Sequence, residues 1–101
     1  MCVIAMFDLP TDTPKARKAY TRFRKNLLED GFTMMQYSVY SRHCASIENA
    51  DVHLRRMGAL VPAEGEVRFL TITDKQFERM QIFWGKIRKP PEPAPCQLSL
   101  F

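Results

Sequence analysis

An unbroken apolar segment opens the chain: residues 2–7 read Cys-Val-Ile-Ala-Met-Phe, and Asp8, Leu9 and Pro10 follow. A short apolar run with branched and aromatic members that stops at a proline predicts a strand buried on both faces. Asp8 then lies where a core strand reaches the surface. A carboxylate in that position either closes the turn before Pro10 or is available to bind a cation, and this segment alone leaves both interpretations open.

Length and composition limit the chain to one domain with one core. It has 101 residues, and 46% of them are hydrophobic, which is enough for a packed interior. The apolar runs are too short to span a bilayer, and the N-terminus lacks the basic region and cleavage site of a signal peptide. The three cysteines are widely spaced and form no pairing motif, which is typical of a reducing compartment. We therefore expect a cytoplasmic protein that does not contact a membrane.

The second predicted element is a helix from Pro14 to about Asp30. A capping hydroxyl or carboxylate in residues 11–13 precedes Pro14, and Gly31 supplies the left-handed stop. We interpret Asp12 as a helix cap. Apolar residues recur at helical spacing along one face: Ala16, Ala19, Tyr20, Phe23 and Leu27.

Every charged residue between Pro14 and Leu28 is basic. At about 100° per residue, these cations occupy two flanks of the helix, with Lys15, Lys18, Arg22 and Lys25 on one and Arg17 and Arg24 on the other. A run of like charge is often only a solvated face, and an acidic protein partner would use the same surface. Six cations without an acid are also enough to bind phosphates. We predict that these six residues and Arg42 contact nucleic acid.

The remaining elements complete a recognisable order. Residues 32–42 are extended, either as one kinked strand or as two short ones. Ser46 can cap a second helix that ends before Pro62, and a strand follows from Glu66 to Thr73. Asp74 can cap a short third helix with apolar residues at spacings of three and four: Phe77, Met80, Trp84 and Ile87. The order predicts a ferredoxin-like β-α-β-β-α-β fold of the α+β class, with two helices on one face of an antiparallel sheet.

A proline-rich segment separates this domain, residues 1–89, from a short tail. Residues 90–95 form a stiff linker that reaches roughly 19 Å at about 3.1 Å per residue. Apolar and polar residues then alternate from Cys96 to Leu100, which is typical of a strand. This strand either folds back onto its own sheet or pairs with the sheet of a neighbour, and in a two-fold dimer the exchange would be mutual. We expect residues 90–101 to form a linker and an exchanged strand.

Several segments together resemble the small CRISPR-associated adaptation proteins of the Cas2 family. They are residues 6–10 (MFDLP), the Arg-rich helix with Tyr20, Phe23 and Arg24, residues 36–40 (QYSVY), and residues 65–74. They follow the order of the family and cover nearly the whole chain. The resemblance implies a ferredoxin-like homodimer that works with the Cas1 integrase on double-stranded protospacer DNA.

The resemblance also implies a metal-dependent endonuclease. In that family, an aspartate at the end of the first strand, Asp8 here, binds one Mg²⁺ shared across the dimer axis. A single carboxylate per chain becomes a pair only if a two-fold axis brings both copies together, and such a pair suits a metal that assists phosphodiester hydrolysis. We interpret His43 and His53 as surface or structural residues, because neither has a neighbouring nucleophile and carboxylate in the sequence.

Two functions from different classes stay open. The chain is a DNA-binding adaptor of the spacer-integration complex, or it is a magnesium-dependent endonuclease that cleaves RNA or DNA through Asp8. We favour the adaptor, because one carboxylate per chain is little for hydrolysis, whereas a charged helix suffices for backbone binding. A ferredoxin-like RNA-binding or regulatory module is less favoured, because we interpret Phe32, Tyr37 and Tyr40 as sheet packing and not as base-stacking platforms.

Overall fold

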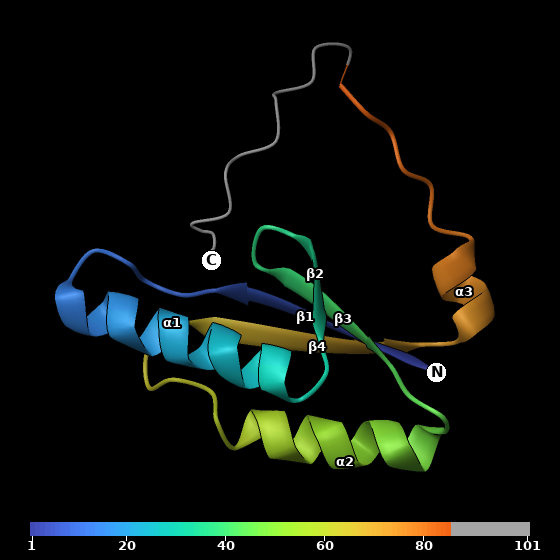
Figure 1. Ribbon diagram of the computed structural model, residues 1–101, viewed down its shortest axis with the longest axis horizontal. Helices are drawn as coiled ribbons and strands as arrows, with labels where there is room; N and C mark the ends of the chain where they lie inside the picture. The colour runs from blue at the N-terminus through green and yellow to red at the C-terminus, as the bar shows by residue number, and fades with distance from the viewer. Residues whose placement is uncertain (86–101) are drawn as a thin grey trace.

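The computed structural model describes residues 1–85 and has the predicted α+β architecture (Figure 1). Its elements are β1 (Cys2–Asp8), α1 (Pro14–Glu29), β2 (Thr33–Gln36), β3 (Val39–His43), α2 (Ile47–Gly58), β4 (Glu66–Ile72) and α3 (Asp74–Glu78). The four strands form one sheet in the order β2-β3-β1-β4, and all three pairings are antiparallel. The β-α-β-β-α-β prediction is confirmed. The predicted linker and exchanged strand, residues 90–101, lie outside the described residues.

Strand β1 is central because it pairs with β3 on one side and with β4 on the other. Val3, Ala5 and Phe7 are buried in the core cluster together with residues of α1 and α2. Alternate residues of a strand point to opposite faces of the sheet. Both long helices therefore cover one face, which we call the helix face, and Asp8 belongs to the other. Figure 1 shows α1 and α2 beside each other, with α3 apart from them at one end of the strands.

The extended segment is a hairpin of two short strands, which resolves the alternative left by the sequence. Tyr37 and Ser38 form the turn between β2 and β3. Ser38 adopts a left-handed backbone conformation with φ 62°, which is uncommon for a residue other than glycine. Its carbonyl accepts a hydrogen bond of 3.1 Å from the N–H of Phe7. The hairpin tip is thereby fixed to the end of β1.

Helix α1 has the predicted length, but its N-cap is Thr13. The prediction of Asp12 as the cap is wrong, because the Oγ1 atom of Thr13 accepts the hydrogen bond from the N–H of Ala16, at 3.0 Å. Asp12 is exposed in the preceding loop. At the other end, Gly31 has φ 98° as predicted for a helix stop, and a Cβ there would lie 3.0 Å from the Nε atom of Arg42.

A buried ion pair ties the end of α1 to α2. The Asp30 side chain is only 4% exposed, and its carboxylate lies 2.8 Å from Nδ1 of His53 and 2.6 Å from Nη1 of Arg56. His53 is itself buried, so its predicted structural role is confirmed. Ser46 caps α2 as predicted, with its hydroxyl accepting a hydrogen bond from the N–H of Asn49.

Helix α3 is shorter than predicted. It ends at Glu78, and Thr73, not Asp74, is its N-cap, in a capping box with Gln76. Met80 and Trp84 lie beyond the helix, which has Arg79 as its C-cap. Residues 82–84 are β-branched or aromatic and have a low helix propensity. None of the helices in residues 1–85 is long and apolar enough to cross a membrane.

Candidate nucleic-acid interface and metal site

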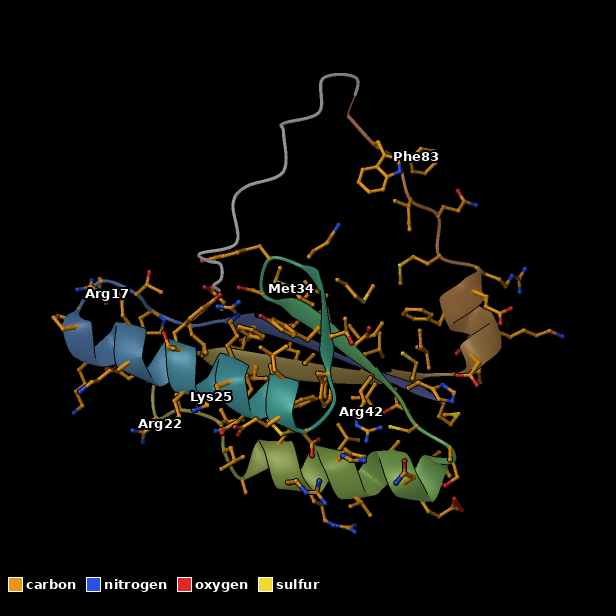
Figure 2. The ribbon with its side chains drawn as sticks, viewed as in Figure 1. Arg17, Arg22, Lys25, Met34, Arg42 and Phe83 are labelled. Carbon is orange, nitrogen blue, oxygen red and sulfur yellow. The ribbon has the colours of Figure 1, made fainter. Side chains whose placement is uncertain are left out.

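Helix α1 buries one side and exposes its cations on the others. Ala16, Phe23 and Leu27 are buried. Five cations are exposed, and we call them the α1 basic surface: Lys15, Arg17, Lys18, Arg22 and Lys25. Figure 2 shows Arg17 on one side of α1 and Arg22 and Lys25 on the other, so the two predicted flanks are present in the structure.

The electrostatics of this surface favour a polyanion. The first turn of α1 has no acidic residue, and no acid follows in the helix before Glu29. Sixteen residues at about 1.5 Å per residue give the helix a length of roughly 24 Å. Duplex DNA carries about one negative charge per 1.7 Å of its axis, so a surface of this length faces many phosphates at once. The arrangement suits contacts to a nucleic-acid backbone.

Two of the predicted nucleic-acid contacts also have structural partners. The Nε atom of Arg24 donates a hydrogen bond of 2.8 Å to the hydroxyl of buried Tyr40. Burial raises the pKa of Tyr40, and the nearby Arg24 charge opposes that rise. Arg42 donates from Nε to the carbonyl of Asp30 and from Nη1 to that of His43. Both arginines thus hold parts of the fold together, which the sequence did not indicate.

Asp8 is exposed at the end of β1, and a second carboxylate faces it. The β1–β4 register places Glu66 directly opposite Asp8. Side chains that face each other in an antiparallel pair lie on the same side of the sheet, with Cβ atoms roughly 4.5–5.5 Å apart. The sequence prediction missed Glu66, because the signal for it is the pairing of β1 with β4, which only the strand order reveals. Asp12, the other acid near Asp8 in the sequence, lies in the loop after β1.

This carboxylate pair fits a hard divalent cation. Magnesium takes oxygen ligands, keeps several waters and is often held by one or two carboxylates. The Oε1 atom of Glu66 lies 2.9 Å from Nε of Arg68, and both side chains are mostly exposed. Within residues 1–85, no group of three or more His, Cys, Asp or Glu side chains could hold a metal ion. A single chain therefore supplies two carboxylates at this strand end, fewer oxygen ligands than a magnesium ion takes.

The sheet face that carries Asp8 also has apolar side chains, and we call it the open face. Its residues at this end alternate with those of the core: Met6, Asp8, Val39, Glu66, Arg68 and Leu70. Leu70 is 49% exposed, and the exposed apolar residues Ile82 and Phe83 follow α3. At the far end, Nδ1 of His43 lies 3.1 Å from Oδ1 of Asp74.

The pKa of the Asp74 carboxyl is lowered from its ordinary value. Its carboxylate accepts a hydrogen bond from the N-terminal ammonium of Met1, which lowers its pKa, and the charge of His43 adds to that effect. Both partners join α3 to the ends of β1 and β3.

Cys2, at the start of β1, is buried, and burial raises the pKa of its thiol. These groups lie at the opposite end of β1 from Asp8.

The aromatic side chains in residues 32–40 divide into two buried rings and one exposed ring. Phe32 and Tyr40 are buried, as the sheet-packing prediction requires, but that prediction is wrong for Tyr37, which is 79% exposed. The Tyr37 ring is stacked against Tyr20 of α1 at a centroid distance of 6.4 Å. The turn conformation of the hairpin directs this side chain outward, and the alternation along a strand does not apply in a turn.

A family model for the CRISPR associated protein Cas2 matches residues 1–80. The chain belongs to the Cas2 family. A "CRISPR-associated endoribonuclease Cas2" of Parvibaculum lavamentivorans is 77% identical over 101 residues, covering 100% of both chains. A relative of the same name from Flavobacterium psychrophilum is 48% identical over 99 residues, covering 98% of this chain and 86% of the relative.

The Cas2 fold is also seen in a solved structure. The crystal structure of Streptococcus pyogenes Cas2 at pH 6.5 matches with a TM-score of 0.62 and 22% identity, and the match covers 83% of this chain and 100% of that one. At this identity the similarity shows the fold alone. The resemblance seen in the sequence is thereby confirmed, and the Cas2 match includes both the α1 basic surface and Asp8.

Proposed function

We propose that this Cas2-family chain is a nucleic-acid-binding adaptor of CRISPR adaptation, in which the α1 basic surface lies along the backbone of double-stranded DNA. The observation that carries the proposal is a 16-residue helix with five exposed cations and no acid before its last turn. Phosphate contacts carry no direct sequence information, so the binding should be independent of sequence. The adaptor would work with the Cas1 integrase, which would supply the chemistry of integration.

The proposed active form is a homodimer that is paired through the open face. Leu70 is half-exposed there, and Met6 and Val39 of the neighbouring strands are only partly buried. Exposed apolar side chains on a sheet face are typical of an interface with another copy. The α1 basic surface belongs to the helix face and would stay accessible on both subunits.

A second candidate function is metal-dependent cleavage of a phosphodiester at Asp8. Two observations favour it: the curated relatives are named endoribonucleases, and Glu66 faces Asp8 at an exposed strand end. In the proposed dimer, the two Asp8 carboxylates would together hold one shared Mg²⁺, with Glu66 of each chain beside it. When bound, such an ion neutralises charge on the phosphate and activates water. RNA and DNA are both candidate substrates.

The adaptor is tested by binding assays with duplexes of three unrelated sequences. The wild-type protein is expected to bind all three with affinities within about twofold of each other, because the backbone dominates. The triple variant Arg17→Gln/Arg22→Gln/Lys25→Gln should lose at least about tenfold in affinity for each duplex.

A matched control removes the same charge elsewhere. Arg55, Lys75 and Arg79 are exposed and lie off α1. Their triple replacement by Gln should leave the affinity for duplex DNA within about twofold of wild type, because only contacting cations release counterions. Equal losses in both triple variants would mean that net charge alone matters and would contradict the proposed role of α1.

A further inference from the structure

Tyr37 is a large aromatic side chain that the fold leaves in water. It is 79% exposed, whereas Tyr40, three residues later, is 1% exposed. Its only described ring contact is with Tyr20, at an interplanar angle of 26°, so most of the Tyr37 ring surface stays open. A side chain this exposed contributes little to the core and is available to contact a ligand.

The turn holds the ring in a defined place. Ser38 is fixed by the hydrogen bond from the N–H of Phe7 to its carbonyl, at 3.1 Å. The Ser38 hydroxyl also lies 3.3 Å from the hydroxyl of Tyr20. A tyrosine phenol is uncharged at neutral pH, and burial raises the pKa of Tyr20 further, so its hydroxyl can act as donor or acceptor. An aromatic ring that is ordered before binding costs less entropy when a ligand contacts it.

The surroundings of Tyr37 point to a nucleic acid. Tyr20, on which the ring rests, has Arg17 three residues before it and Arg24 four residues after it, and such residues are neighbours on a helix surface. Asp8, the candidate metal ligand, directly follows Phe7, whose N–H donates a hydrogen bond to the carbonyl of Ser38 at the hairpin tip. Because Tyr37 contacts α1, it lies on the helix side of the sheet and stays accessible in a dimer formed through the open face.

We propose that Tyr37 stacks on an unpaired nucleobase of a strand whose phosphates contact the α1 basic surface. Every base has a π-face, so stacking on an aromatic side chain tolerates any sequence. In a duplex, both faces of a base are covered by its neighbours, so Tyr37 selects strand ends, extensions and single strands. The inference rests on the proposed nucleic-acid binding and adds a substrate class to it, a strand with an unpaired base, which either RNA or DNA can supply.

The test compares four labelled probes: a blunt duplex, the same duplex with a single-stranded extension, and single strands of RNA and of DNA. Tyr37→Ala should weaken binding of the extended duplex by at least about fivefold, the lower end of the loss when a stacked aromatic is removed. Binding of the blunt duplex should not change. The single strand, RNA or DNA, for which Tyr37→Ala loses more affinity is the preferred source of the unpaired base.

Two controls separate stacking from folding. Tyr37→Phe keeps the ring and should bind every probe as the wild type does, whereas Tyr37→Leu keeps an apolar contact with Tyr20 but should lose as much affinity as Tyr37→Ala. When the extension contains abasic sites, the wild type and Tyr37→Ala should bind the extended duplex with equal affinity, because no base is present for the ring to stack on. Thermal unfolding of each variant shows that the fold is retained.

The outcomes distinguish this inference from the function on which it rests. A wild type that binds no probe would overturn the proposed nucleic-acid binding and this inference together. Normal binding of the blunt duplex, with Tyr37→Ala equal to wild type on all four probes, would overturn the stacking role alone. An equal loss on blunt and extended duplexes would also overturn it, because the ring would then act on the backbone or on the fold.

Discussion

Helix α1 and the end of strand β1 are both exposed, but their charges are opposite in sign and they suit different ligands. The helix presents five cations spread over its length, whereas the strand end presents Asp8 with Glu66 opposite it. Affinity for a polyanion rises with the number of cations that contact it, but a cation site needs only a few oxygen ligands. Binding of a nucleic-acid strand and chemistry on that strand should therefore be separable by mutation.

The two regions also lie on different sides of the sheet. Phe7 is in the core beneath α1, so its neighbour Asp8 belongs to the open face. Pairing of two chains through that face, about a two-fold axis near Asp8, would bring the acidic ends together and leave the α1 basic surfaces outside. Any metal chemistry should therefore depend on the dimer, while contacts to the phosphate backbone should exist in each chain.

The largest expected effect separates cleavage from binding. Asp8→Asn should abolish metal-dependent cleavage of RNA or DNA, because the amide keeps the size of the carboxylate but loses the charge that attracts the cation. DNA binding and spacer integration with the integrase should persist. Cleavage is measured with labelled substrates in the presence of magnesium and of a chelator. Equal cleavage by wild type and Asp8→Asn would exclude this carboxylate as the metal ligand.

The next effect tests whether the open face pairs two chains. Leu70→Asp should weaken dimerisation by about 100-fold, because an unpaired charge would be buried in the interface. Sedimentation equilibrium measures the change. Leu28→Asp is a matched control, since Leu28 is 46% exposed but lies on α1, and Leu70 is 49% exposed. Dimerisation that is lost equally in both variants, or in neither, would place the interface elsewhere.

A smaller effect concerns the acid at the end of α1. Asp30→Ala should lower the free energy of unfolding by about 2–3 kcal/mol, because it leaves the buried His53 without its partner. The affinity for DNA should stay near that of wild type, since Asp30 is buried and its charge is paired. Glu29→Ala, an exposed neighbour, is expected to change stability by less than about 0.5 kcal/mol. Chemical denaturation of both variants checks this difference.

The sequence predicts the elements whose signals are local. Pro14 and Gly31 mark the ends of α1, Ser46 marks the start of α2, and the apolar run before Asp8 marks the central strand. These signals depend on residues close together in the chain. The charge of α1 is also local, so the basic helix could be predicted before any fold was known.

What the sequence could not predict depends on turns and on strand order. Glu66 meets Asp8 only because β4 pairs with β1 in one particular register. Tyr37 is exposed because a left-handed residue, Ser38, follows it in a tight turn, although its neighbours alternate as a strand does. The spacing of Met80 and Trp84 is compatible with a helix, but the chain leaves α3 before them.

The salt dependence of duplex binding shows whether the α1 basic surface contacts phosphates independently of Asp8. Each phosphate contact contributes about 0.9 to the slope of log affinity against log salt concentration. The wild type and Asp8→Asn should have equal slopes, and the triple variant Arg17→Gln/Arg22→Gln/Lys25→Gln should have a slope smaller by roughly 2–3 units. A triple variant with the slope of the wild type would contradict the proposed role of the α1 basic surface, because α1 would then face something other than the DNA backbone.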